Sequence, residues 1–307
     1  MKAIIFKYQL LLFSLVFFII SCNKRVNNDT TDQIPNDRIS IPKFGEASTF
    51  EIACWNIENF GNTAYHDVDQ QITDVVEIIK DLDIDLFAVE EIGSQSAFNS
   101  LLGKLSDYDG YLAAFSGNQR TGIIYNDSLI TIISDTLLFE NDSYNFPRPP
   151  LMLFLKAQQG NQIFDFHLIV IHLKAYGDSE SENRRRVAIQ KMEQFIDMRL
   201  QQIGDPDYII AGDWNDELTD AASNNVFLPF LNKQPQEYIF LTWPLRNTDY
   251  SYIPSSYRSL IDHIMVTSSI DTSYSNETQI IKVDQFFSQY LAEVSDHRPV
   301  ASKFFVF

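Results

Sequence analysis

Short polar clusters at the ends of apolar, strand-like segments constrain the fold of this chain more than any other feature of its sequence. An apolar or alternating segment predicts a β-strand, and strand ends converge at one edge of a sheet. Side chains that are far apart in the sequence can therefore meet in space at that edge. The clusters are Asn56, Glu90-Glu91, His172, Gly212-Asp213-Trp214-Asn215, Asp262-His263 and Ser295-Asp296-His297.

Between these clusters the chain has many predicted strands and a few predicted helices. Apolar residues at helical spacing indicate helices over residues 68–82, 95–105 and 182–203, and Gly204 is a natural stop for the last of them. Many strands with few helices favour a sheet sandwich with helices outside. The predicted strands cover residues 50–54, 86–89, 122–125, 129–133, 151–155, 163–171, 208–211, 261–267, 279–283 and 300–307.

The residue types in the polar clusters suit one kind of chemistry. Carboxylates and an amide offer the oxygen ligands that a hard cation such as Mg²⁺ prefers. Two histidines, His172 and His297, suit proton transfer and the stabilisation of a charged phosphorane. An Asp beside an Asn, as in Asp213 and Asn215, can take a proton from water and orient it. The clusters therefore fit metal-assisted chemistry at a phosphate group.

Six motifs that contain these residues follow one another along the chain. They are Trp55-Asn56-Ile57-Glu58-Asn59-Phe60, Val89-Glu90-Glu91-Ile92, His172-Leu173-Lys174, Gly212-Asp213-Trp214-Asn215, Ile261-Asp262-His263-Ile264 and Ser295-Asp296-His297-Arg298-Pro299. In order and spacing they resemble the endonuclease/exonuclease/phosphatase superfamily over about residues 50–307. Any single motif is weak evidence, but six in order are not. The resemblance implies a four-layer α/β sandwich, with two packed mixed β-sheets flanked by helices.

The resemblance implies a divalent metal site. Glu91 should bind the ion, Mg²⁺ or Mn²⁺, with support from Asn56 and Asp296. The family pattern usually has Gln before its metal-binding Glu, whereas this chain has Glu90, which we expect to face away from the site. The ion would polarise a non-bridging phosphate oxygen and neutralise developing charge.

The resemblance also implies catalytic roles for five side chains. Asp213 should activate the attacking water, and Asn215 should orient that water or the phosphate. His297 should contact the scissile phosphate, with Asp262 holding its tautomer. His172 should be a second histidine that faces the phosphate. The reaction that follows from these roles is hydrolysis of a phosphodiester.

Other polar residues near the motifs have structural interpretations. His167 shares a strand with His172, but the odd interval between them places it on the other face of the sheet, where it packs or lies at the surface. We expect His263 to be structural and His66 to lie in a loop. Glu58 fits a surface position or one beside the metal ligands.

Several stretches favour the nuclease branches of the superfamily. Abasic-site endonucleases carry a Tyr-rich motif where this chain has Ile171-His172-Leu173, which disfavours the repair branch. Arg120 and Arg148 lie in segments that resemble those placed beside the DNA backbone in deoxyribonuclease-like enzymes, and Arg148 can pair with a flanking phosphate. Arg184-Arg185-Arg186 resembles the basic start of the long helix in secreted bacterial nucleases, but it fits a solvated helix face equally well.

The charge of the chain limits how it can hold nucleic acid. The formal net charge is −18, so the surface repels free polyanions at long range and does not steer DNA or RNA toward the protein. A bound divalent cation can reverse the local field. The acidity therefore counts against tight, non-specific binding but does not exclude a phosphate-ester substrate.

The N-terminus resembles the export signal of a bacterial lipoprotein. Lys2 and Lys7 precede an apolar run over residues 10–20, which is short for a stable membrane span. Cys22 follows it at the position of a lipidated cysteine. We expect residues 1–22 to be a lipoprotein signal peptide with lipidated Cys22. A plain secretory signal and an uncleaved anchor are the alternatives.

Two further regions follow this signal. Residues 23–47 are polar and are predicted to form a flexible tether. Residues 48–307 form the predicted catalytic domain, in which Cys54 is expected to be a buried free thiol. The protein is thus expected outside the cytoplasm, lipid-anchored to a bacterial membrane, either the outer membrane or the cell surface.

These observations predict a divalent-metal-dependent phosphodiester hydrolase, and most simply an extracytoplasmic nuclease that acts on DNA or RNA. The alternatives are a phosphoesterase that acts on a lipid or on a sugar or inositol phosphate, and a non-catalytic surface-binding protein. A sphingomyelinase carries an exposed aromatic hairpin; residues 286–291 are a candidate for one but also fit a buried element. No protein partner is inferred, and we expect a monomer.

Overall fold

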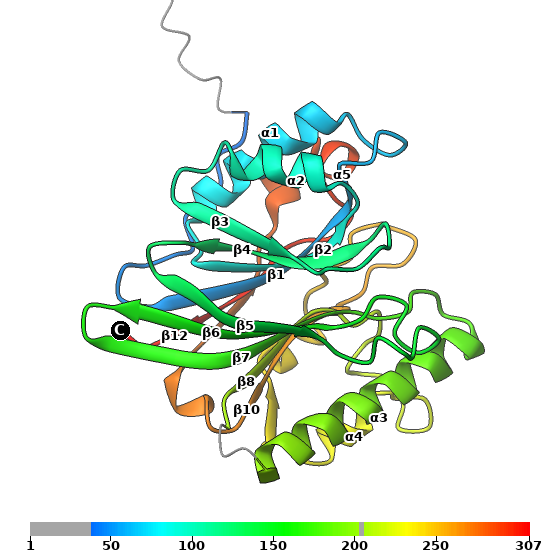
Figure 1. Ribbon diagram of the computed structural model, residues 1–307. Coiled ribbons are helices and arrows are strands. Elements are labelled where there is room, and N and C mark those ends of the chain that lie inside the picture. Colours follow the sequence, from blue (N-terminus) through cyan, green and yellow to red (C-terminus); the bar gives the residue numbers. More distant parts are fainter. Residues whose placement is uncertain (1–37, 203–205) are drawn as a thin grey trace, which may run out of the picture. The chain divides into compact units, whose positions relative to one another are not determined.

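Two packed six-stranded β-sheets form the centre of the structure, a computed structural model that describes residues 38–202 and 206–307 (Figure 1). The first sheet has the order β11 (Tyr274–Ile280), β12 (Val300–Phe304), β1 (Phe50–Phe60), β2 (Leu86–Ile92), β4 (Arg120–Asn126) and β3 (Tyr108–Leu112). The second has the order β5 (Ile130–Leu137), β6 (Leu151–Gln159), β7 (Gln162–His172), β8 (Tyr208–Asp213), β10 (Asp262–Thr267) and β9 (Tyr238–Phe240).

Each sheet is mixed, because one parallel pair lies among antiparallel neighbours. Strand β1 runs parallel to β2, and β7 runs parallel to β8. Strand β12 is antiparallel to β1, and β10 is antiparallel to β8. In each sheet, the carboxyl ends of the parallel pair therefore lie at the same edge as the amino end of the antiparallel neighbour. Polar residues that close one strand can thus meet polar residues that open another.

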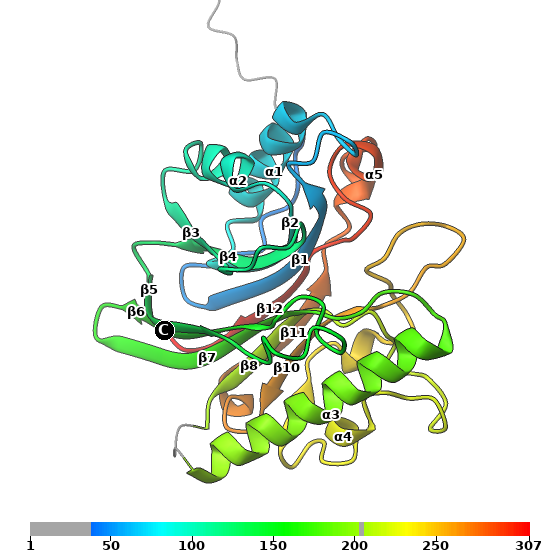
Figure 2. The same ribbon diagram turned by 45° about the vertical axis from the view of Figure 1, so that its right-hand side comes forward.

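Helices cover the outer face of each sheet (Figure 2). Helices α1 (Val68–Leu82), α2 (Gln95–Leu102) and α5 (Tyr290–Glu293) pack on the first sheet through a shared apolar cluster. Helices α3 (Ser179–Gln202) and α4 (Leu228–Leu231) pack on the second. Short 3₁₀ turns lie at Trp243–Leu245, Asp271–Ser273 and Val283–Gln285. The predicted four-layer α/β sandwich with two mixed sheets is confirmed.

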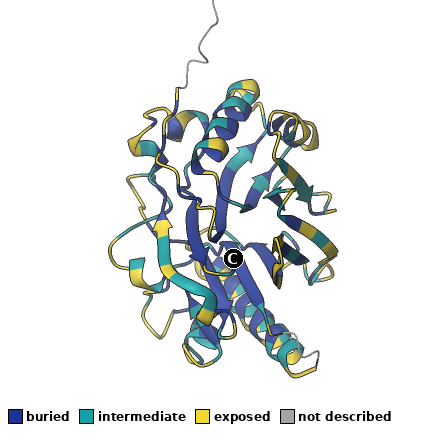
Figure 3. Ribbon diagram, turned by 90° about the vertical axis from the view of Figure 1, so that its left-hand side faces the viewer, coloured by how far each residue is buried: buried dark blue, intermediate teal, exposed yellow. Residues whose placement is uncertain are grey.

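Alternation along β1 shows how the layers are built. Phe50, Ile52 and Cys54 point into the apolar cluster between the two sheets. Ala53 and Trp55 point the other way, into the cluster beneath the helices. Figure 3 shows the central strands as largely buried. Cys54 is a buried free thiol, as predicted.

The folded domain begins earlier than the sequence indicated. Ile39, Ile41 and Phe44 are buried in the cluster beneath the helices of the first sheet. The backbone N–H of Ile41 donates to Asp81 Oδ2 at 2.8 Å. The predicted tether over residues 23–47 is therefore wrong at its carboxyl end, because residues 38–47 bury apolar side chains against the domain. The predicted signal peptide and Cys22 lie outside the described residues.

Other element boundaries also differ from the prediction. Helix α3 begins at Ser179 because Asp178 caps it: Asp178 Oδ1 accepts from the Ser181 N–H at 3.0 Å and Oδ2 from the Ser181 hydroxyl at 2.7 Å. The predicted stop at Gly204 lies outside the described residues. Strands β3 and β9 were not predicted. Within residues 38–202 and 206–307, none of the helices has the length and apolar character needed to cross a membrane.

A pair of carboxyl groups at the start of β1 and β2, the buried Glu51 and the half-buried Asp85, gives a prediction about stability. The Glu51 N–H donates to Asp85 Oδ2 at 3.0 Å. Burial, with a contribution from the Glu51 carboxyl, raises the pKa of Asp85 to about 8. An unfolded Asp titrates near about 3.9, so the folded state binds more protons between these values and its free energy of unfolding falls as the pH rises across that range.

We expect Asp85→Asn to reduce this fall, because an amide oxygen still accepts the Glu51 N–H and does not titrate. Urea unfolding at pH 5 and pH 8 measures the difference for wild type and variant. The exposed Asp107→Asn, which makes the same change in charge nearby, is the control. An equal loss of stability in wild type and Asp85→Asn would contradict the assignment.

Candidate active site

The polar clusters meet in a cleft of about 870 Å³. Strand register explains how. Asp213 at the end of β8 pairs with His172 at the end of β7 and with Asp262 at the start of β10. In the first sheet, Asn56 of β1 pairs with Glu90 of β2. Of the predicted catalytic, metal-binding and substrate-binding residues, those that line the cleft are Glu91, Arg148, His172, Asp213, Asn215, Asp296 and His297.

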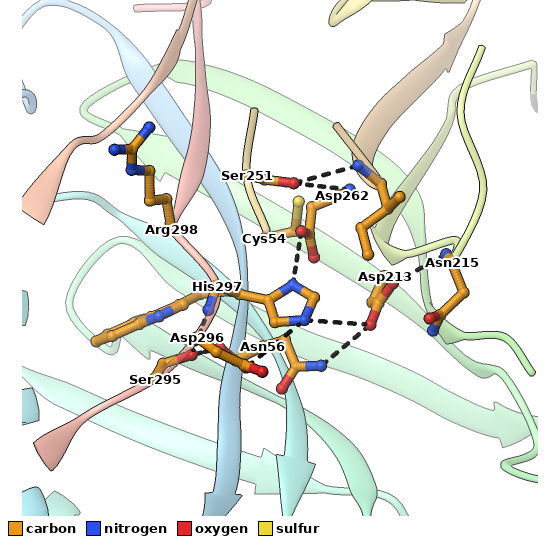
Figure 4. A network of polar contacts seen from close by, with 12 residues as sticks. Cys54, Asn56, Asp213, Asn215, Ser251, Asp262, Ser295, Asp296, His297 and Arg298 are labelled. Atoms are coloured by element: carbon orange, nitrogen blue, oxygen red, sulfur yellow. Dashed lines mark hydrogen bonds and ion pairs between the residues drawn. The ribbon is translucent and has the colours of Figure 1, made fainter. Parts of the chain in front are cut away.

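His297 lies at the centre of a polar network (Figure 4). Its Nδ1 is 2.8 Å from Asp262 Oδ2, a hydrogen bond that fixes the ring. Its Nε2 is 3.9 Å from Asp213 Oδ2 and 3.8 Å from Asp296 Oδ1. Burial alone lowers the pKa of His297, but these three carboxylates raise it well above its usual range. The imidazolium form is therefore favoured, with Nε2 directed into the cleft.

Asp213 accepts hydrogen bonds from Asn56 and Asn215, two of the predicted site residues. Asn56 Nδ2 donates to Asp213 Oδ2 at 3.1 Å, and the Asn215 backbone N–H donates to Oδ1 at 2.9 Å. His172 Nε2 lies 3.6 Å from Asp213 Oδ2. Burial, and then the charge of Asp262, raises the pKa of Asp213 above its usual range. A carboxylate shifted in this direction is a better proton acceptor near neutral pH.

A β-bulge in β2 sends Glu90 and Glu91 to different places. The pairing of β2 with β4 is irregular between Val89 and Ile92, and Glu91 has a φ of 61°. Glu91 lines the cleft, and its Oε1 is 3.7 Å from His172 Nε2. Glu90 is fully buried outside the cleft lining, and neither carboxyl oxygen has a hydrogen-bond partner in the described part of the chain. Bulges next to functional sites re-aim side chains in this way.

Three oxygen donors fit a hard divalent cation. Asn56 Oδ1 is buried and has no hydrogen-bond partner among residues 38–202 and 206–307. Glu91 and Asp296 add carboxylates on the cleft side. Glu58 also lines the cleft, accepts the Asp296 N–H at 3.1 Å, and has its pKa raised to about 7 by burial and then by Asp296 and Glu91. An amide oxygen among crowded carboxylates is the donor set that Mg²⁺ and Mn²⁺ prefer.

A second group also brings ligand atoms together. Asp213, Asp262 and His297 place one such atom each within 4.8 Å of one another. However, His297 Nδ1 and Asp262 Oδ2 are already hydrogen-bonded to each other. The neighbouring carboxylates raise the pKa of His297 well above its usual range, and in the imidazolium form both ring nitrogens carry a proton and cannot bind a metal. This group therefore fits proton handling, and the oxygen donors Asn56, Glu91 and Asp296 fit the cation.

Of the two arginines predicted to bind substrate, only one lies in the cleft. Arg148 lines the cleft, where its guanidinium donates to the Leu173 carbonyl oxygen at 3.3 Å and to Gln119 Oε1. Arg120 donates to Gln95 Oε1 at 2.9 Å and is not among the cleft-lining residues. The structure therefore does not bring Arg120 to the site, because its guanidinium bonds Gln95 at the start of helix α2.

His167 and His263 pack as the sequence suggested. The His167 ring lies 4.8 Å from Phe154 and 4.7 Å from Tyr208, between ring centroids. His263 is fully buried, with Nδ1 2.9 Å from Thr242 Oγ1 and Nε2 3.1 Å from a backbone carbonyl oxygen. Both residues support strands and do not line the cleft.

Several residues that shape the site carry no sequence motif. The Ser251 hydroxyl accepts the backbone N–H of Asp262 at 3.2 Å, which fixes the start of β10. The Tyr290 hydroxyl donates to the His297 carbonyl oxygen and accepts from Trp55 Nε1 at 3.0 Å. These supports come from loops and a short helix that show no periodic pattern. A single polar residue in such a segment does not stand out in the sequence as part of a functional site.

Solved structures with a similar fold support this description. D. rerio TDP2 in complex with a single-strand DNA product matches with a TM-score of 0.62 and 14% identity over 84% of this chain and 99% of that one. A mannosyl-6-phosphatase from Bacteroides thetaiotaomicron matches at 0.57 and 16% over 83% and 99%. The Neisseria 3′ phosphatase NExo, bound to a product DNA hairpin, matches at 0.60 and 12% over 83% and 99%. At these identities the likeness concerns the fold.

A family model gives the relationship directly. No curated protein matches the chain in sequence at a significant level. The model of the Endonuclease/Exonuclease/phosphatase family matches residues 53–297. The match runs from β1 to the His297 cluster and so includes the strand ends that build the cleft. The chain belongs to the Endonuclease/Exonuclease/phosphatase family.

Proposed function

We propose that this protein is a divalent-metal-dependent phosphodiester hydrolase that acts on DNA or RNA outside the cytoplasm. The observation that carries the proposal is the convergence of Asp213, the His297–Asp262 pair and the oxygen donors around Glu91 in one cleft. Two of the similar structures contain product DNA, which supports a nucleic acid as the leading substrate.

The chain's own side chains can perform the hydrolysis. Asp213 accepts a proton from the water that attacks phosphorus, and the Asn215 backbone N–H holds that carboxylate in place. His297, kept cationic by its carboxylate neighbours, donates a hydrogen bond to a phosphate oxygen. Burial, and then Arg148, lowers the pKa of His172 well below its usual range, so His172 acts as a neutral hydrogen-bond donor.

Asn56, Glu91 and Asp296 would hold the metal ion. When bound there, Mg²⁺ or Mn²⁺ supplies positive charge against the phosphate oxygens. Arg148, which lines the same cleft, adds a second cation for the substrate. These charges offset the repulsion between a net −18 protein and an anionic substrate.

A sugar phosphate is the second candidate substrate. Glu217 and Asp220 line part of the cleft, and carboxylates bind sugar hydroxyls well. The fold similarity to a mannosyl-6-phosphatase favours the same class.

We further propose that the protein is held outside the cytoplasm by a lipid on Cys22. This proposal rests on the sequence motif alone. Mass spectrometry of protein extracted from membranes would detect the lipid.

Removal of the metal should abolish activity. The domain from Arg38 onward is incubated with single-stranded DNA, RNA, mannose 6-phosphate and sphingomyelin, each with Mg²⁺, Mn²⁺ or EDTA. We expect cleavage of DNA or RNA that EDTA stops and added Mg²⁺ or Mn²⁺ restores. Asp213→Asn, which keeps the shape of the side chain but removes the negative charge, is the inactive control.

Each other outcome has a definite meaning. EDTA-sensitive hydrolysis of mannose 6-phosphate or sphingomyelin alone would keep the site and replace the substrate. Cleavage of nucleic acid that is equal with EDTA would contradict the metal site. No hydrolysis of any substrate by a folded domain would contradict the proposed function.

A further inference from the structure

The two sides of the cleft carry opposite charge. We call Arg148, Lys174 and Arg184 the basic arm, and Glu182, Asp216, Glu217 and Asp220 the acidic arm. Lys174 follows His172 at the end of β7, and Asp216, Glu217 and Asp220 follow Asp213 at the end of β8. Glu182 and Arg184 lie in the first turns of helix α3. Because β7 lies between β6 and β8 in the second sheet, Arg148 before β6, His172 and Asp213 at the ends of β7 and β8, and the acidic residues after β8 follow one another along the cleft edge.

The basic arm continues into a second hollow of about 540 Å³. Lys174 and Arg148 line both hollows, so the two are continuous. No Asp or Glu is among the residues that line the second hollow, although it lies in a protein of net charge −18. Within the described residues, none of the three basic-arm cations lies within 4.0 Å of a carboxylate oxygen. Cations held together without carboxylates indicate a site for a polyanion.

Aromatic rings accompany these cations. Lys174 Nζ lies 4.2 Å from the centroid of the Tyr176 ring, and Arg184 lies 4.6 Å from that of Tyr144. Tyr65 is 59% exposed, and it and Phe115 line the second hollow. Exposed rings beside unpaired cations are what a single strand of nucleic acid requires, because bases stack on the rings and phosphates pair with the cations.

The acidic arm is unsuited to a phosphate. Asp216 is neutralised by Arg185 at 2.7 Å, and Glu182 pairs with Arg186. Glu217 and Asp220 have no basic partner within 4.0 Å in the part of the chain described. A phosphate placed beside them would meet two uncompensated carboxylates, whereas hydroxyl groups of a sugar would find hydrogen-bond acceptors.

We propose that a nucleic-acid strand enters through the basic arm only, and that the acidic arm receives a terminal nucleoside without a further phosphate, so that the enzyme cleaves at strand ends. Hydrolysis forms one bond from the water oxygen to phosphorus, breaks the ester bond to the departing oxygen and leaves that oxygen protonated. This inference rests on the proposed function, because it specifies where along a strand that chemistry occurs.

Circular and linear DNA distinguish end cleavage from internal cleavage. A closed single-stranded DNA circle and the linear strand of the same sequence, internally labelled, are each incubated with the domain and Mg²⁺. The smallest preference that we take as support for end cleavage is about tenfold, which corresponds to about 1.4 kcal/mol. We expect the linear strand to be cleaved at least about tenfold faster than the circle, with release of one terminal nucleoside unit at each cleavage.

Variants test each arm separately. Glu217→Gln/Asp220→Asn should raise cleavage of the circle relative to the linear strand. Asp127→Asn/Glu140→Gln, which makes the same charge change at exposed positions outside the cleft, should leave that ratio unchanged. Lys174→Met should raise KM for the linear strand and reduce the slope of log KM against log salt by about 0.7. The exposed Lys104→Met is its control.

The outcomes separate this inference from the proposed function. Equal cleavage of circle and linear strand by wild type would overturn end cleavage and leave the nuclease proposal intact. A circle-to-linear ratio that Glu217→Gln/Asp220→Asn does not change would overturn the role of the acidic arm. Hydrolysis of mannose 6-phosphate with no cleavage of either DNA would overturn both proposals.

Discussion

Asp262→Asn and His297→Ala are each expected to lower kcat/KM for phosphoester hydrolysis by about 10²–10⁴. Truncation of His297 removes the side chain that donates a hydrogen bond to the phosphate oxygen. Asp262 acts through His297, because its Oδ2 holds Nδ1 at 2.8 Å and, with the neighbouring carboxylates, keeps the ring cationic. An Asn at this position can present its amide to Nδ1, which permits the wrong tautomer and withdraws the negative charge.

The double variant shows whether the two side chains act as one unit. We expect Asp262→Asn/His297→Ala to be no less active than His297→Ala alone, since residues of one unit are not additive. In Asp262→Asn, the alkaline limb of the pH–rate profile should move to lower pH, because the largest of the three carboxylate contributions to the raised His297 pKa is removed. Thermal unfolding monitors the fold. Multiplicative losses in the double variant, or an unmoved alkaline limb, would refute the coupling.

The convergence of the site could be predicted from the sequence because it depends on strand ends. His172 and Asp213 end β7 and β8, which are parallel, and Asn56 is the last residue of β1 in the regular parallel pairing with β2. Asp262 and His297 come before apolar segments, and β10 and β12 run antiparallel to their neighbours, so these residues arrive at the same edge. Two facts are sufficient for this inference: successive side chains of a strand point to opposite faces, and the relevant strand ends lie at the same end of the sheet.

Local irregularity and edge position explain what was missed in the fold. Strand β3 lies at a sheet edge with mostly half-buried residues, and β9 has three residues, so neither shows the apolar alternation on which strand prediction depends. Strand β11, also at an edge, begins at Tyr274 and is largely polar. The bulge that separates Glu90 from Glu91 depends on a positive φ at a glutamate, which no sequence rule anticipates.

Charge balance within the cleft could not be predicted either. The sequence shows a net charge of −18 but not which carboxylates lack a basic partner. The three consecutive arginines illustrate this: Arg184 stacks on Tyr144, Arg185 is buried against Asp216, and Arg186 bonds backbone carbonyls. Successive positions on a helix point in different directions, so one basic run serves three separate contacts.

Arg185→Met is expected to lower the free energy of unfolding by about 3–5 kcal/mol. The Arg185 side chain is 5% exposed, and its Nε donates to Asp216 Oδ2 at 2.7 Å. Its Nη1 donates to the backbone carbonyl oxygens of Lys174 at 2.8 Å and Tyr176 at 2.7 Å. One guanidinium thus joins the loop after β7 to the loop after β8, and its removal leaves a buried carboxylate and two carbonyls without these donors.

A double-mutant cycle separates the cost of the orphaned charge from the loss of packing. Asp216→Asn removes the carboxylate that Arg185→Met leaves unpaired, so Arg185→Met/Asp216→Asn should be less destabilised than the sum of the single variants. Urea unfolding gives these energies, and amide hydrogen exchange should quicken at residues 173–177, which lose their anchor. Strict additivity would mean that the pair contributes no mutual stabilisation. Unchanged exchange in that loop would mean that other contacts hold the cleft wall.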